Sequence, residues 1–159
     1  MKKPLIFIIV FFGLAYIASA QVNPHALGLR FGGNGNINSA EISYQHGLTD
    51  ANRMELDLGF GASSTQTRLF VIGIYHWDWI ISRGLNWYIG PGVGAGFYAF
   101  EDAVNYINVA LGGQAGIEFD FNTMNVPFLL SVDVRPMWDF LGHDAGLGWG
   151  AALGVRYTW

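Results

Sequence analysis

The sequence predicts an all-β fold of eight antiparallel strands, and three observations indicate it. Clusters of glycine, asparagine, aspartate and serine, which favour chain reversals, divide residues 21–159 into eight segments. Within the segments apolar residues alternate with polar or small ones, which is the period of a β-strand. No helical periodicity lies between them. Short turns between consecutive strands predict hairpins in an up-and-down order. The turn clusters are residues 32–36, 49–52, 62–66, 82–84, 101–103, 122–125 and 142–146.

Residues 1–20 have the pattern of a cleaved secretory signal peptide. Lys2 and Lys3 precede an apolar run that ends at Ile17, and Ala18-Ser19-Ala20 resembles a small-residue cleavage site. The run is shorter than the about 20 apolar residues of a membrane-spanning helix. We therefore expect export through the Sec pathway and a single domain of residues 21–159.

Composition limits the environment and the partners of this domain. Cysteine is absent, so no disulfide framework is available. Both lysines lie in the predicted signal peptide, which leaves arginine as the only strongly basic residue against 12 carboxylates. A nucleic-acid partner is not expected, because the domain lacks a basic stripe. Hydrophobic residues make up 52% of the chain and charged residues 13%, and the apolar residues are dispersed by alternation.

The first three segments alternate clearly. Charged residues such as Arg30, Glu41 and Arg53 share a row with glycine, serine and other polar residues. The opposite, apolar rows are, in order, Leu27, Leu29 and Phe31; Ala40, Ile42 and Tyr44; and Met54, Leu56, Leu58 and Phe60.

The fourth segment, Arg68 to Trp79, has large apolar residues in both of its rows. Phe70, Ile72 and Ile74 share a row with charged or polar Arg68, His76 and Asp78. We assign this row to the side of the other charged rows. The opposite side then holds Leu69, Val71, Tyr75, Trp77 and Trp79.

The last four segments alternate again. Pro91 and Pro136 lie within them, and each lacks a backbone N–H, so we expect local bulges at both positions. The apolar rows are, in order, Trp87, Ile89, Val93, Ala95 and Phe97; Ile107, Val109, Leu111, Ile117, Phe119 and Phe121; Phe128, Leu130, Val132, Val134 and Trp138; and Leu147, Trp149, Ala151, Leu153, Val155, Tyr157 and Trp159.

Two eight-stranded barrels fit this alternation, and they are inverses of each other. A soluble lipocalin-like barrel holds its apolar row inside, whereas a transmembrane barrel turns it to lipid and keeps a polar lumen. Charges on a soluble surface include many lysines, but here only arginines accompany the carboxylates. Planar arginine pairs with carboxylates in a crowded interior. We therefore predict a transmembrane β-barrel whose lumen is filled by Arg30, Glu41, Arg53, Glu55, Asp57, Arg68, Asp78, Glu118, Asp120, Asp133, Arg135, Asp139 and Arg156.

The tryptophans support the same sidedness. All six fall in the outward row and most lie near strand ends, where aromatic girdles meet the two membrane interfaces. The predicted girdle is Trp77, Trp79, Trp87, Trp138, Trp149 and Trp159.

With the signal ending at Ala20, eight alternating segments and the terminal stretch from Gly154 to Trp159, the chain resembles the small eight-stranded outer-membrane barrels of Gram-negative bacteria, the OmpA/OmpX/OmpW-like class. In that class the last strand carries a tag read by the barrel-assembly machinery, and Gly154, Tyr157 and Trp159 match it, with tryptophan where phenylalanine is commoner. The resemblance implies outer-membrane localisation, lipid and lipopolysaccharide neighbours, periplasmic chaperones during biogenesis, and both chain ends in the periplasm.

The expected function is a structural or interaction role in the cell envelope without catalysis. The four predicted outer loops are short, and the four histidines are scattered, so no catalytic, cofactor or metal site is predicted. Two alternatives remain open. One is a narrow pore for ions or small solutes. The other is a lipid-A-modifying hydrolase, for which the candidates are Ser63 or Ser64 with His143 and Asp144.

Overall fold

The computed structural model describes residues 22–34, 37–101, 104–141 and 145–159. The predicted signal peptide lies outside the described residues. No helix in these ranges is long and apolar enough to cross a membrane.

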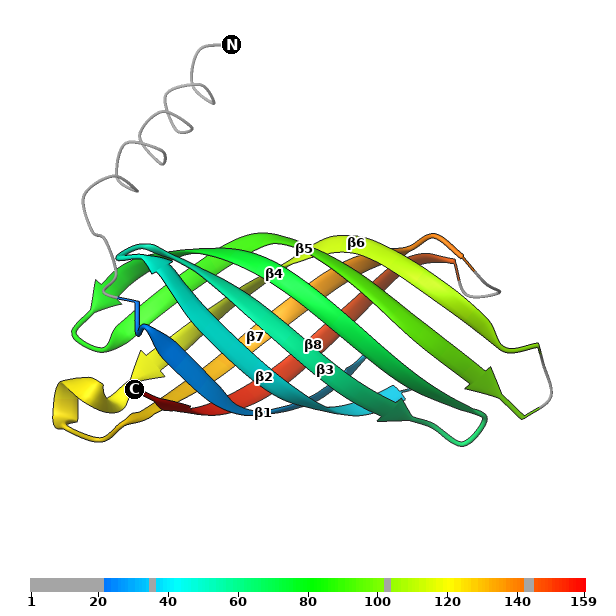
Figure 1. The fold of residues 1–159 in the computed structure, drawn as a ribbon, viewed down its shortest axis with the longest axis horizontal. Coiled ribbons are helices and arrows are strands. Elements are labelled where there is room, and N and C mark those ends of the chain that lie inside the picture. Colours follow the sequence, from blue (N-terminus) through cyan, green and yellow to red (C-terminus); the bar gives the residue numbers. More distant parts are fainter. Residues whose placement is uncertain (1–21, 35–36, 102–103, 142–144) are drawn as a thin grey trace, which may run out of the picture.

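The described chain forms a closed barrel of eight antiparallel strands in sequence order (Figure 1). Each strand pairs with the next, and β1 pairs with β8 to close the sheet. One short 3-10 helix, η1 (Phe121–Met124), connects β6 to β7. The predicted all-β, antiparallel, up-and-down barrel is therefore confirmed. The strands are β1 (His25–Asn34), β2 (Ile37–Thr49), β3 (Asn52–Ala62), β4 (Gln66–Ser82), β5 (Leu85–Phe100), β6 (Tyr106–Asp120), β7 (Phe128–Asp139) and β8 (Gly146–Thr158).

The barrel has two distinct ends. The start of β1, the end of β8 and η1 gather at one end, which we call the near end (Figure 1). The last residues of β1, β3, β5 and β7 lie at the opposite, far end, and no more than six residues separate each of these strands from the next one in the sequence (Figure 1). The barrel is thus little more than its strands at the far end.

Alternation along each strand separates buried from exposed side chains. In β3, Arg53, Glu55 and Asp57 are no more than 2% exposed, whereas Met54 and Leu56 between them are 48% and 53% exposed. Soluble proteins bury apolar side chains and expose charged ones, and all round this sheet the arrangement is the opposite. The interior is therefore rich in charge and the exterior is apolar.

Strand β4 alternates between buried and exposed side chains in the same way, although both of its rows contain large apolar residues. Ile74, His76 and Asp78 are at most 1% exposed, while Trp77 between the last two is 42% exposed. The sheet register decides this facing, because β4 must continue the alternation of β3 and β5.

The bulges predicted at Pro91 and Pro136 are wrong. The β4–β5 ladder skips two pairs beside Pro91 and resumes in the same register, and the β6–β7 ladder does the same beside Pro136. On its other edge each proline stays paired, Pro91 with Gly113 and Pro136 with Trp149. A proline lacks a single N–H, so it interrupts the ladder on one side only, and the intact neighbour holds the register. Register shifts occur instead beside near-end turns, at Gly47/Thr49 and Ile80/Ser82.

Candidate functional site

The lumen contains the largest concentration of charged groups among the described residues. Alternate residues of the strands point into it, because a closed sheet has only one inner face. Four arginines and six carboxylates form the set we call the lumenal network, and each is at most 5% exposed. Its members are Arg30, Arg53, Arg135, Arg156, Glu41, Glu55, Asp57, Asp78, Glu118 and Asp133.

Arg135 on β7 is the centre of this network. Its Nη1 donates to Glu41 Oε2 at 3.0 Å, and its Nε donates to Gln114 Oε1 at 2.9 Å. Its Nη2 donates to Asp57 and lies 3.4 Å from Glu55 Oε1. One guanidinium therefore links β7 to β2, β3 and β6 across the lumen, and it satisfies all three of its nitrogens.

Arg30 on β1 extends the network to the next side of the barrel. Its Nη1 donates to Glu41 Oε2 at 2.7 Å, so Arg30 and Arg135 share one carboxylate oxygen. Its Nε donates to Asp133 Oδ2 at 3.2 Å, and its Nη2 donates to the other oxygen of the same carboxylate. This bidentate pairing fixes both side chains in one geometry.

Arg156 on β8 binds between two hydroxyls and a carboxylate. Its Nε donates to Ser43 Oγ at 3.0 Å, its Nη1 to Ser131 Oγ at 2.8 Å, and its Nη2 to Glu55 Oε2 at 3.0 Å. Gly154 provides the space, because a Cβ there would lie 2.5 Å from Ser131 Oγ and 2.7 Å from Arg156 Nη1. A side chain at this position is therefore incompatible with the observed guanidinium.

Arg53 on β3 organises the near half of the lumen. Its Nη1 and Nη2 donate to the two oxygens of Glu118 at 2.8 and 2.6 Å, and Nη2 lies 3.3 Å from Asp78 Oδ1. The guanidinium also sits 4.7 Å from the ring centre of Tyr88, a cation–π contact. Its Nε is 3.4 Å from His76 Nδ1.

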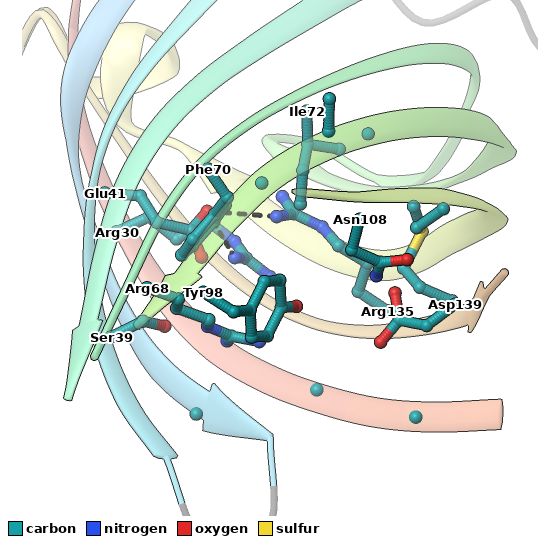
Figure 2. Close-up of a pocket in the computed structure, with 18 of the residues that line it drawn as sticks. Arg30, Ser39, Glu41, Arg68, Phe70, Ile72, Tyr98, Asn108, Arg135 and Asp139 are labelled. Carbon is teal, nitrogen blue, oxygen red and sulfur yellow. Dashed lines mark hydrogen bonds and ion pairs between the residues drawn. The ribbon is translucent and has the colours of Figure 1, made fainter. Parts of the chain in front are cut away.

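Beyond the network, the far half of the lumen contains a vestibule (Figure 2). The space that it offers to water-sized groups is about 70 Å³. Arg30, Glu41 and Arg135 from the network line it, together with Arg68 and Asp139. The vestibule borders the lumenal network at Arg30 and Arg135, whose ion pairs connect strands across the lumen.

Three of the predicted lumenal residues lie outside the lumenal network. Arg68 and Asp139 line the vestibule. Asp120 is at the near end, where its Oδ1 accepts hydrogen bonds from the backbone N and side-chain Nδ2 of Asn122 at 2.9 and 2.7 Å. Its Oδ2 accepts from Asn23 Nδ2 at 2.9 Å, so Asp120 anchors η1 and the residues before β1. The structure brings the other ten predicted residues together.

Neutral side chains complete the network, and the sequence prediction named none of them as site residues. They share one signal that would have identified them, namely a hydrogen-bonding side chain in the inward row. Gln114 Nε2 and Gln45 Nε2 donate to the two oxygens of Glu55 at 3.2 and 2.5 Å, and Tyr88 Oη donates to Asp133 Oδ2 at 3.3 Å.

The predicted girdle and assembly residues all belong to the outward side apart from Gly154. Trp79 and Trp87 stack at 4.5 Å between ring centres near the near end, and Trp159 stacks on His25 at 5.5 Å. Trp138 and Trp149 are exposed in the far half of β7 and β8. Tyr157 and Trp159 are exposed at the end of β8, where their rings stack on each other.

The residues that the structure describes do not include a catalytic triad formed by the hydrolase candidates. Ser63 Oγ donates to the carbonyl of Gln66 and accepts from the N–H of Thr65, both at 3.4 Å, which are contacts of a turn. His143 and Asp144 lie outside the described residues. In the described part of the chain, no group of three or more histidines and carboxylates is arranged to hold a metal ion.

Solved structures of three bacterial proteins are similar to this barrel. The N-terminal β-barrel domain of Pseudomonas aeruginosa OprF has a TM-score of 0.65 at 17% identity, covering 85% of this chain and 96% of that one. Neisserial surface protein A has a TM-score of 0.64 at 13% identity, with coverages of 85% and 94%. Ail, the attachment invasion locus protein of Yersinia pestis, has 0.53 at 12%, with 85% and 96%. This chain has the fold of the small eight-stranded outer-membrane barrels.

The resemblance predicted from the sequence is thus confirmed at the level of the fold. No protein-family model matches the sequence, and no curated protein matches it. At these identities the shared feature is the barrel itself, so what this barrel does is argued below from its own residues.

Replacing Arg135 by leucine tests the lumenal network. The substitution removes the arginine partner of buried Asp57 and leaves Glu41 paired with Arg30 alone, so we expect the free energy of unfolding to fall by about 3–5 kcal/mol. Urea unfolding in detergent micelles measures it. Arg83→Leu is the matched control, because Arg83 is exposed in the β4–β5 turn. An unchanged midpoint for Arg135→Leu would contradict the network's role.

Replacing Gly154 by alanine tests the close packing around Arg156. The added Cβ displaces the guanidinium from Ser131, so we expect a loss of about 1–3 kcal/mol. Gly73→Ala is the matched control, because a Cβ at Gly73 meets nothing within 4 Å. The same urea titration compares the two variants, and equal stabilities would show that the glycine is not required for packing.

Proposed function

We propose that this protein is an integral outer-membrane barrel of a Gram-negative cell envelope, with a structural or interaction role and no catalysis of its own. The observation that carries the proposal is the sidedness of the sheet, with apolar side chains exposed all round the barrel and ion pairs buried inside it. An exposed apolar band of this extent is unfavourable in water and favourable in lipid. The fold shared with outer-membrane barrels supports the same placement.

The proposed orientation puts the near end in the periplasm and the far end outside the cell. Both the start of β1 and the end of β8 are at the near end, as the resemblance implies (Figure 1). Short far-end connections leave little surface for a large adhesin-like contact. Partners in the envelope are then chiefly the lipids and lipopolysaccharide that surround the apolar band.

The exposed end of β8 supports a role for periplasmic chaperones and the barrel-assembly machinery during biogenesis. Tyr157 and Trp159 remain on the outside of the closed barrel, where their side chains are available before and after closure. Gly154 on the same strand faces inward and serves packing around Arg156. The two parts of the proposed tag therefore have separable physical roles.

An arginine placed in the middle of the outer apolar band tests the membrane assignment. Leu58→Arg adds a charge near the middle of β3, and we expect it to cost about 2–4 kcal/mol in a bilayer. Thr67→Arg is the control, because Thr67 is outward-facing near the far end of β4, where the cost falls to about 0–1 kcal/mol. Equilibrium unfolding in phospholipid vesicles gives both values. Equal costs at the two positions would count against a membrane-embedded band.

Planar-bilayer recordings test whether the lumen conducts. Ion pairs of Arg30, Arg135 and Arg156 join β1, β2, β3, β7 and β8 across the lumen, so we expect no steady single-channel current at neutral pH. The fold that this chain shares with OprF does not determine whether ions pass through the lumen, so the current must be recorded. A steady current would favour the narrow-pore alternative and show that the network opens.

A further inference from the structure

The vestibule in the far half of the lumen contains an arginine that the network does not use. Among the described residues Arg68 has no ion pair, and its Nε is buried without a hydrogen-bond partner. Its guanidinium lies 4.7 Å from the ring centre of Phe70. The arginines of the lumenal network each pair with at least one carboxylate. A partly buried cation without an anionic partner is a recognition element for an anion.

From this we infer that the vestibule is a binding site for a small organic anion with a planar apolar body, whose carboxylate or phosphate pairs with Arg68. This function goes beyond the proposed structural role and does not depend on it.

Charge is distributed so that an anion is attracted to the vestibule and stopped below it. Three arginines and two carboxylates line the vestibule, namely Arg30, Arg68, Arg135, Glu41 and Asp139. Asp133 and Asp57 pair with Arg30 and Arg135, and deeper in the lumen two arginines face three carboxylates, namely Arg53, Arg156, Glu55, Asp78 and Glu118. Because Arg30 and Arg135 are already paired with carboxylates, the attraction of an anion to the vestibule comes from Arg68, and the carboxylates deeper in the lumen oppose further entry.

The walls of the vestibule fit an apolar ring beside the charge. Phe70, Tyr98 and Met137 provide apolar surface, and Figure 2 shows Arg68 lying close to Tyr98 on one side of the space. Asn108 provides a polar group, because its Oδ1 accepts from Leu141 N at 3.0 Å and its Nδ2 remains to donate.

Glycines keep this space open. A Cβ at Gly94 would approach Ile72 Cγ1 at 3.1 Å, and a Cβ at Gly96 would approach Tyr98 at 3.1 Å. Gly150 differs, because a Cβ there has its nearest neighbour at 3.5 Å. A larger residue at Gly150 therefore fills the vestibule without a Cβ clash, which allows a test of shape that leaves Arg68 unchanged.

The test measures binding by isothermal titration calorimetry with the purified protein in zwitterionic detergent that contains no lipopolysaccharide. The probes are benzoate and phenyl phosphate, with benzamide as the neutral control of the same shape. We expect both anions to bind one per barrel, benzamide to bind at least about tenfold more weakly, and anion affinity to fall as salt increases.

Variants separate charge from shape. Arg68→Gln is expected to weaken benzoate binding by about tenfold to a hundredfold, the usual range for a hydrogen bond to a charged group. Gly150→Val is expected to weaken it by occupying the space. Arg83→Gln removes the same charge from the near end and is expected to leave the affinity unchanged.

Several outcomes would overturn the inference. These are no binding of either anion up to about 10 mM, which corresponds to a binding free energy weaker than about −2.7 kcal/mol; equal binding of benzoate and benzamide; or unchanged affinity in Arg68→Gln. Binding that requires added lipopolysaccharide would also overturn it, since the ligand would then be a lipid headgroup. If Arg68→Gln fails to fold, unchanged affinity in Gly150→Val is the contradicting result.

Discussion

Ion pairing inside the barrel is the interaction on which the rest of this structure depends. Closing eight strands directs alternate side chains into a lumen that side chains alone can fill. Each charge placed there loses its water, and that loss is offset only where guanidinium and carboxylate groups meet in good geometry. Arg135 achieves this by contacting Asp57, Glu41 and Gln114 from three other strands. The same contacts tie together strands that are distant in the sequence, so they stabilise closure as well as the charges themselves.

Small residues in the inward row are the counterpart of these long side chains. A Cβ at Gly116 would lie 2.6 Å from Tyr88 Oη and 2.7 Å from Asp133 Cβ, and a Cβ at Gly59 would lie 2.2 Å from the ring of Phe70. The glycine-rich inner row is therefore determined by the volumes of the side chains opposite it. These glycines are therefore required because a larger residue would collide with neighbouring side chains, and not because the backbone must be flexible there.

The sequence predicted the strands and their facing because both follow from a period of two, which is local. It also predicted which charges point inward, as for Arg53 and Glu55. It did not predict their partners, because pairing across the lumen depends on the register and tilt of all the strands: Arg30 contacts Asp133, 103 residues away in the sequence. The prolines were misjudged for a related reason. The effect of Pro91 depends on which of its two neighbouring strands loses a hydrogen bond, and the sequence of one strand does not contain that information.

Side-chain length at the inward positions, rather than the fold, determines where this lumen is filled. In the near half the inward row contains Arg53, Tyr88 and Arg156, whose side chains hydrogen-bond to residues of strands that are not their neighbours in the sheet. In the far half the inward row contains Gly94, Gly96 and Gly150. These residues have no side chains to fill the lumen, and they line the vestibule. The number of strands is the same at both levels. A barrel with one architecture can therefore be filled by side chains at one level and hollow at another, so the lumenal network and the vestibule are compatible features of a single sheet.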